Sequence, residues 1–329
     1  ATVLNNLAAL YEVQAKYAHA QPLYQRALAI WEKTLGPAHP EVATALNNLA
    51  TLFYAEGKYA QAEPLHQRAL AIRKKALGPA HPDVAQSLNN LAELYDAQGK
   101  YAKAKPLYER ALAIWQKALG PAHPDVATAL NNLAGLYKAQ GKYAQVEPLY
   151  QRALAIREKA QGPAHPDVAQ SLNNIAELYR IQGKYVQAER LYQRSLAIRE
   201  KALGSAHPAV ATVLNNLAAL YITESKYAQA EPLYQRALAI REKVLGPEHP
   251  AIATSLNNLA ALSYEQGKYA QAEPLYQRSL AIWEKTLGPG HPDVATSLKN
   301  LAALYRKTSR EKEAAELETR AANIISIKR

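Results

Sequence analysis

The sequence predicts an all-α solenoid, an array of stacked antiparallel helix pairs with about 16 helices. A unit of 42 residues recurs without insertion or deletion, because an Asn-Asn pair begins at Asn5 and returns at every 42nd position through Asn257. Alanine and leucine, both strong helix formers, dominate the 49% of hydrophobic residues. The β-branched enrichment that is typical of sheets is missing. Each unit is therefore expected to form one helix pair that stacks on the next.

The repeat period divides the chain into seven full units and a divergent last one. We expect a single array, because repeats of this kind pack only on their neighbours. The last unit gains charge at apolar or neutral positions, which predicts a polar cap. Residue 1 enters a repeat without the His-Pro start, so we expect preceding sequence or self-association through this uncapped N-terminal repeat. The full repeats are 1–42, 43–84, 85–126, 127–168, 169–210, 211–252 and 253–294, and the capping repeat is 295–329.

The second repeat shows where its two helices should begin and end. Pro40 suits the first helical position, and His39, held extended by that proline, suits the N-cap. Gly57 fits the left-handed position that closes the first helix. The second helix is expected at residues 59–77, because a Gly-Pro pair follows it. Apolar residues recur at three- and four-residue steps in both segments, as in amphipathic helices.

The repeated motif resembles a tetratricopeptide repeat. It reads N-L-A-x-L-Y-x-x-Q-G-K-Y-x-x-A-x-x-L-Y-x-R-A-L and is followed by G-P-x-H-P-D. The usual unit of that family has 34 residues, and the longer unit here is similar to the repeats of kinesin light chain and related bacterial and fungal proteins. The resemblance covers essentially the whole chain. It implies a right-handed superhelix whose first helices line a concave groove, in which family members commonly bind extended peptides.

Two asparagines in each repeat are the predicted ligand contacts. At ~100° per residue, they lie opposite the apolar arc of the first helix and should line the groove. An amide both donates and accepts hydrogen bonds, so it can hold the backbone of an extended peptide of any sequence. Alternatively, one member of each pair bonds the neighbouring repeat. The predicted groove asparagines are Asn47, Asn48, Asn89, Asn90, Asn131, Asn132, Asn173, Asn174, Asn215, Asn216, Asn257 and Asn258.

Other positions on this face change from repeat to repeat. A surface that reads ligand side chains would vary in this way, and so would a surface under no constraint. A further series, aligned with Thr51, includes Glu93, Gly135 and Glu177. The variable groove positions are Tyr54, Asp96, Lys138, Arg180, Ile222 and Tyr264.

Charge and composition narrow the classes of partner. The net charge of +11 favours acidic partners in general. The recurring Lys58, Arg68 and Lys75, however, should lie at the edges and on the outer second helices, so they are poor evidence for an acidic ligand in the groove. The chain has no cysteine, which excludes disulfides and thiolate sites. It also has no apolar run near ~18 residues and no signal peptide, so we expect a soluble, cytoplasmic protein without membrane contact.

The sequence predicts no enzyme activity, cofactor or metal site. One histidine per repeat, in a G-P-x-H-P turn, cannot supply several ligands to one ion. A catalytic constellation is singular, whereas these side chains recur seven times. Recurring tyrosines on apolar stripes and uniform asparagines argue against nucleic acid. Trp31, Trp115 and Trp283 alternate with arginines such as Arg73 late in the second helix, which we interpret as packing.

The sequence therefore favours a non-enzymatic scaffold whose groove binds a protein or extended peptide. The repeats are nearly identical to one another, which indicates recent duplication or consensus design. Natural binding grooves usually differ from repeat to repeat, because each pocket contacts a different side chain. A structural or self-associating spacer array with no dedicated ligand is the alternative.

Overall fold

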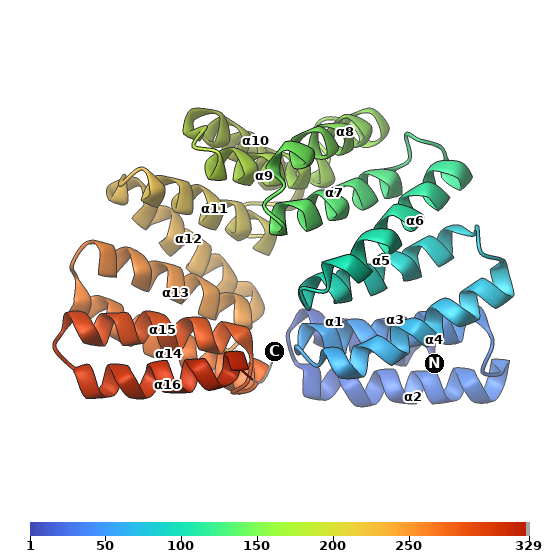
Figure 1. The fold of residues 1–329 in the computed structure, drawn as a ribbon, viewed down its shortest axis with the longest axis horizontal. Coiled ribbons are helices and arrows are strands. Elements are labelled where there is room, and N and C mark those ends of the chain that lie inside the picture. The colour runs from blue at the N-terminus through green and yellow to red at the C-terminus, as the bar shows by residue number, and fades with distance from the viewer. Residues whose placement is uncertain (327–329) are drawn as a thin grey trace. The chain divides into compact units, whose positions relative to one another are not determined.

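In the computed structural model, residues 1–326 are described, and they form sixteen α-helices and no strand (Figure 1). The all-α repeat solenoid expected from the sequence is confirmed. The first helices of the pairs are α1 (Thr2–Val13), α3 (Pro40–Ala55), α5 (Pro82–Ala97), α7 (Pro124–Ala139), α9 (Pro166–Ile181), α11 (Pro208–Thr223), α13 (Pro250–Glu265) and α15 (Pro292–Lys307). The second helices are α2 (Tyr17–Leu35), α4 (Tyr59–Leu77), α6 (Tyr101–Leu119), α8 (Tyr143–Gln161), α10 (Tyr185–Leu203), α12 (Tyr227–Leu245), α14 (Tyr269–Leu287) and α16 (Glu311–Ser326).

The helices form two compact units. The first unit is Ala1–Gln182 and holds α1 to α9, and the second begins at Gly183 and holds α10 to α16. Within each unit every helix packs on the helices before and after it in the chain (Figure 1). Each unit is thus built from local contacts, as expected of a repeat array.

Histidine side chains fix where the first helices begin. His39 has an extended backbone (φ −75°, ψ 142°), and its Nδ1 accepts a hydrogen bond of 3.2 Å from the Glu41 backbone N–H. This bond satisfies one of the free N–H groups of the first turn. The predicted N-cap role is confirmed for His39, His81, His123, His165, His207, His249 and His291.

Glycines end the helices of the second repeat at the predicted places. Gly57 follows α3 with φ 72°, which is the left-handed conformation expected at this turn. Gly78 follows α4 with φ 86° and ψ 156°, a combination that is essentially restricted to glycine. A side chain at Gly78 would therefore strain the turn that leads into the next repeat.

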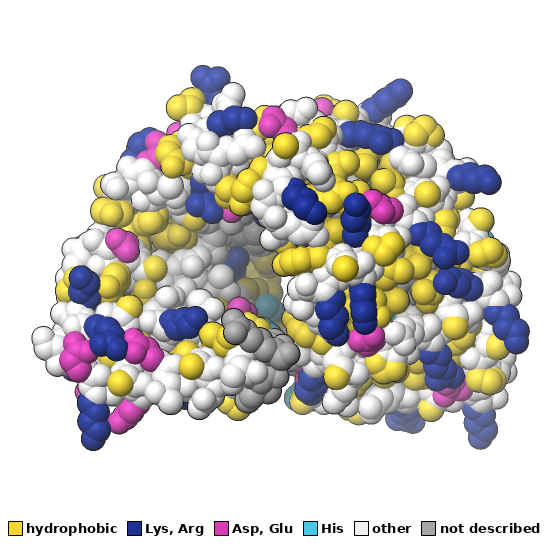
Figure 2. Space-filling view, in the orientation of Figure 1, with side chains coloured by type: hydrophobic (Ala, Val, Ile, Leu, Met, Phe, Trp, Pro, Cys, Tyr) yellow, Lys and Arg dark blue, Asp and Glu magenta, His cyan; other side chains and the backbone are white. Residues whose placement is uncertain are grey.

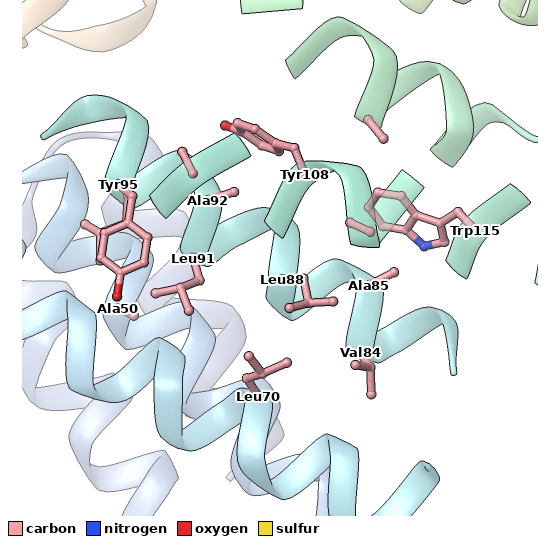
Figure 3. Close-up of a cluster of buried hydrophobic side chains, with 14 of the residues drawn as sticks. Ala50, Leu70, Val84, Ala85, Leu88, Leu91, Ala92, Tyr95, Tyr108 and Trp115 are labelled. Carbon is pink, nitrogen blue, oxygen red and sulfur yellow. The ribbon is translucent and has the colours of Figure 1, made fainter. Parts of the chain in front are cut away.

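Alternating small and large side chains fill the space between helices. In the first unit, Ala50, Ala85 and Ala92 are fully buried and allow the helix backbones to approach closely. Leu88 and Leu91 pack beside them (Figure 3). Fixed alanine positions thus explain why each pair stacks on the next in the same register.

The arginines that alternate with tryptophan do more than pack. Arg73 is buried, and its Nη1 donates to the Asp83 carbonyl oxygen and to Ser87 Oγ, each at 3.1 Å. Arg241 makes the same two bonds, to the Ala251 carbonyl at 3.0 Å and to Ser255 Oγ at 2.7 Å. The interpretation as packing alone is wrong for these arginines, because each guanidinium joins its helix to the start of the next repeat.

Tryptophan at the same position does fill space as expected. Trp115 is 1% exposed, and Ala129 stands fourteen residues later in the next first helix, where three of the four arginine repeats carry serine and the fourth carries Val213. The last tryptophan breaks this pairing, because Ser297 occupies the position opposite Trp283. Its hydroxyl is buried and has no hydrogen-bond partner in the described part of the chain. Ser297 is therefore a polar group buried at a cost.

The final helix has the polar character predicted for a cap. Most of α16 is exposed, and its buried side chains are Ala314, Ala321 and Ile324. Ion pairs hold it against α15, from Arg306 to Glu311 at 2.6 Å and to Glu318 at 2.7 Å. The predicted cap extends to residues 327–329, which lie outside the described residues. At the other end, α1 exposes apolar side chains, with Val3 79% and Val13 68% accessible.

Candidate functional site

The first asparagine of each pair is not on the open face. In five repeats its side chain is between 2% and 8% exposed. Its amide is used internally: Asn47 Nδ2 donates to Ser87 Oγ at 3.3 Å, and Asn131 Nδ2 donates to the Ala127 carbonyl at 3.1 Å. The prediction of a groove contact is therefore corrected for Asn47, Asn89, Asn173 and Asn215, because the surrounding residues cover them. Asn131 is 8% exposed but still borders the pocket described below.

The second asparagine of several pairs is half-buried and links neighbouring repeats. Asn132 Nδ2 donates to Asn89 Oδ1 at 2.9 Å, and Asn174 Nδ2 donates to Asn131 Oδ1 at 3.4 Å. The alternative interpretation, a bond to the neighbouring repeat, thus holds for these side chains. Asn132 Oδ1 still accepts no hydrogen bond from residues 1–326, so it can accept one from a ligand. The same link joins Asn48 to Asn5 and Asn300 to Asn257, each at 2.9 Å.

A pocket of about 440 Å³ opens on the first-helix face of the first unit. It is lined by residues of four successive repeats, among them Gly135 in the middle of α7. A Cβ at this glycine would meet nothing within 4 Å, so the missing side chain leaves open space. The lining residues are Tyr54, Glu93, Asp96, Ala97, Tyr101, Tyr108, Asn131, Asn132, Gly135, Ala139, Tyr150 and Asn174.

Two carboxylates give the pocket its charge. Glu93 and Asp96 lie three residues apart on α5, and burial raises the pKa of both. Asn89 and Asn132 donate hydrogen bonds to Glu93 Oε1, at 2.9 and 2.6 Å, and these bonds lower the pKa of Glu93. The negative charge on Asp96 raises the pKa of Glu93. Neither carboxylate forms an ion pair within the described residues. The pocket is therefore acidic although the chain as a whole is basic.

Sequence reasoning placed only part of this site. Of the variable positions, Tyr54 and Asp96 line the pocket, whereas Glu93 was seen only as variation and the tyrosines of α6 and α8 were assigned to packing. The sequence did contain a signal, the charge of the residue three positions after each glutamate. Glu177 is followed at that distance by Arg180, whereas the aligned Glu93 is followed by a second acid, Asp96. The Glu177–Arg180 pair is bidentate, at 2.8 and 2.9 Å.

The remaining variable positions do not join this pocket. Lys138 and Arg180 lie beyond its lining in the first unit, and Ile222 and Tyr264 belong to the second unit. All four side chains are partly accessible. Tyr264 packs against Tyr269 with ring centroids 5.5 Å apart. These four side chains therefore stay predicted contacts.

Basic side chains lie mainly on the outer helices and pair with acids there. Arg68 contacts Glu32 at 2.5 Å, and Arg236 contacts Glu200 at 2.6 Å, in each case from one second helix to the preceding one. Lys and Arg side chains are scattered over the visible surface rather than gathered in one patch (Figure 2). The positive charge is thus not concentrated at the acidic pocket.

Other classes of site find little support in residues 1–326. No group of three or more His, Cys, Asp or Glu side chains there could hold a metal ion. None of the described helices combines the length and apolarity needed to cross a membrane.

Comparison with known proteins decides the family. The model of the family described as Tetratricopeptide repeat matches seven overlapping segments, residues 1–75, 42–117, 83–159, 125–201, 167–243, 209–273 and 252–325. The chain belongs to the tetratricopeptide repeat family. The repeats of this tetratricopeptide protein have the long unit of 42 residues, and the chain is a protein-interaction scaffold in the general sense of its family.

Solved structures agree with this assignment. A Podosopora anserina protein with nearly identical, kinesin light chain-type TPR-like repeats is 30% identical, with a TM-score of 0.51, over 63% of this chain and 97% of that one. BtubC (BKLC) from P. vanneervenii is 24% identical, with a TM-score of 0.55, over 72% and 91%. A Rap protein complexed with Competence and Sporulation Factor is 14% identical, with a TM-score of 0.65, over 99% and 98%. The last two share the fold alone. No curated protein sequence matches this chain.

Proposed function

We propose that the first-helix face of residues 1–182 binds an extended peptide of a partner protein, and that the chain acts as a non-enzymatic scaffold. The observation that carries this proposal is the pocket of about 440 Å³ lined by Asn132 and Asn174 from successive repeats. The side-chain amide oxygen of Asn132 (Oδ1) is available to accept a hydrogen bond from a backbone N–H of the peptide. Such a contact does not depend on the sequence of the peptide.

The spacing of the repeats suits an extended ligand. Packed helices lie roughly 10 Å apart, and an extended chain rises about 3.3 Å per residue. One repeat therefore spans about three residues of peptide. The Rap protein, which shares the fold, has been solved in complex with Competence and Sporulation Factor, so the fold is compatible with a bound partner.

Selection of extended 12-residue peptides from a random library tests the proposal. The affinity of each selected peptide is measured by calorimetry on the parent chain and on the double variant Asn132→Ala with Asn174→Ala. We expect the double variant to weaken binding by roughly thirtyfold, since two lost hydrogen bonds at about 1 kcal/mol each sum to about 2 kcal/mol. An unchanged affinity would show that the peptide binds elsewhere.

Asn48→Ala is the matched control. It removes the same type of link between repeats, from Asn48 to Asn5, but Asn48 does not line the pocket. A loss of stability alone would affect both variants, whereas a loss of ligand contact affects only the double variant. Thermal unfolding followed by circular dichroism separates the two effects.

A further inference from the structure

The acidic pocket holds two carboxylates for which residues 1–326 supply no counterion. Burial raises the pKa of Glu93 and Asp96, and no lysine or arginine opposes that rise. Both hydrogen bonds to Glu93 reach Oε1, so Oε2 receives none from the described chain. Carboxylates removed from water without a cation are costly. In a chain with net charge +11, this arrangement indicates that the cation comes from outside.

Two buried tyrosines point to the same conclusion independently. Tyr108 is 1% exposed and Tyr150 is 3% exposed, and both line the pocket. Neither hydroxyl has a hydrogen-bond partner in the described part of the chain, whereas the equivalent Tyr24 donates to Glu12 Oε2 at 2.7 Å. The Tyr108 hydroxyl lies on the side of its ring away from Trp115 (Figure 3). Each ring is buried, but its hydroxyl oxygen remains accessible at the pocket and can bond a ligand there.

Other repeats supply the contrast. At the positions of Glu93 and Asp96, the fifth repeat carries Glu177 and Arg180, which neutralise each other. The later repeats carry alanine at the first of these positions. Glu93 and Asp96, two neighbouring acids without a counterion among residues 1–326, therefore lie beside the space that Gly135 of the following first helix leaves open.

We propose that this pocket receives a basic side chain of the bound peptide, arginine in preference to lysine. The inference rests on the proposed peptide-binding function and specifies the ligand. Guanidinium carries five N–H donors in a planar fork and stacks on aromatic rings, whereas ammonium is a compact point charge. Glu93 Oε2, the Asp96 carboxylate and the two tyrosine hydroxyls supply acceptors, and the rings of Tyr54 and Tyr101 border the space.

Selection of 12-residue peptides from a random library is carried out in parallel on the parent chain and on the double variant Glu93→Gln with Asp96→Asn. We expect arginine to be enriched in peptides selected on the parent and not in those selected on the variant. A selected peptide is then resynthesised with lysine, or with the neutral isostere citrulline, in place of its arginine. We expect citrulline to weaken binding by at least about tenfold, and lysine to weaken it less.

Glu177→Gln is the matched control, because it removes a carboxylate from the same helix position, where Arg180 already neutralises it. It should leave the arginine preference unchanged. If peptides bind but arginine and citrulline bind equally, the basic-residue inference is overturned and the peptide-binding function stands. If no peptide is selected on either protein, both proposals are overturned. The citrulline peptide leaves the protein unaltered, so misfolding of a variant cannot imitate the expected result.

Discussion

His66 should make the first unit lose stability in acid. It stands in α4 where most repeats have tyrosine, and it is 3% exposed. Its Nδ1 lies 2.9 Å from Asn47 Oδ1, so the neutral ring donates from Nδ1 to that oxygen. Burial lowers the pKa of His66 from 6.5 to about 4. The unfolded chain therefore binds a proton at this residue at higher pH than the folded chain does.

The sign and size of the effect follow from this difference. Above pH 6.5 both states hold a neutral ring, and the full contribution to stability is present. As pH falls towards 4, only the unfolded state gains the proton, so the free energy of unfolding decreases. One pKa unit is worth about 1.36 kcal/mol, which gives a loss of roughly 2.5 kcal/mol between pH 7.5 and pH 4.5.

The variant His66→Tyr isolates this contribution, because it restores the residue found in most repeats. Guanidinium unfolding followed by circular dichroism, at pH 7.5 and pH 4.5, gives the change in stability for parent and variant. We expect the parent to lose roughly 2.5 kcal/mol more than the variant. Amide hydrogen exchange in α3 and α4 would localise the loss, which matters because repeat arrays need not unfold in one step.

His81→Asn is the control for this experiment. His81 is more exposed and acts as an N-cap, a role that asparagine also fills. Comparing this variant with the parent shows whether a change in pH dependence is specific to the histidine at position 66. If His66→Tyr and the parent lose the same free energy between the two pH values, the assignment of a buried neutral histidine is refuted.

Three further predictions concern other parts of the chain. Ser297→Ala should stabilise the second unit by about 1 kcal/mol, because it removes an unpaired buried hydroxyl opposite Trp283, and a lower melting temperature would contradict this. Gly135→Ala should raise the free energy of unfolding by about 0.5–1 kcal/mol, and with it the melting temperature, because glycine is costly inside a helix and the new methyl group meets no atom within 4 Å. An unchanged or lower melting temperature would count against this prediction. The alternative of a self-associating spacer predicts concentration-dependent light scattering that Val3→Gln with Val13→Gln abolishes, and a parent that stays monomeric at every concentration would refute that alternative.

The repeat period made helix boundaries predictable to the residue. Proline and glycine have narrow conformational ranges, so their recurrence marked the limits of α3 and α4 directly. It was harder to infer which side chains of a helix face the groove and which face the next repeat. Both asparagines of a pair lie opposite the apolar arc, but the first is covered by the next repeat, and a helical projection of one helix does not include its neighbour.

Contacts between repeats escaped sequence analysis for a related reason. Arg73 and Ser87 are fourteen residues apart and belong to different repeats, so their bond is visible only once the helices are stacked. The pairing of arginine with serine and of tryptophan with alanine was present in the sequence, but the arginines were interpreted from their hydrophobic stems alone. Interpreting a repeat protein therefore requires comparing each position with the facing position of the next unit.

That comparison also separates functional variation from surface drift at the acidic pocket. Neutral drift tends to keep substitutions that leave stability unchanged, yet the pocket combines several that lower it. Glu93 and Asp96 are partly buried without a counterion, and Gly135 weakens the interior of α7. Local rules of this kind are most often broken at functional sites. Ser297 also breaks such a rule, because its hydroxyl is buried without a partner, but it lines none of the pockets described. A single unfavourable group is therefore weak evidence for a site. Several unfavourable groups that converge on one open space indicate binding.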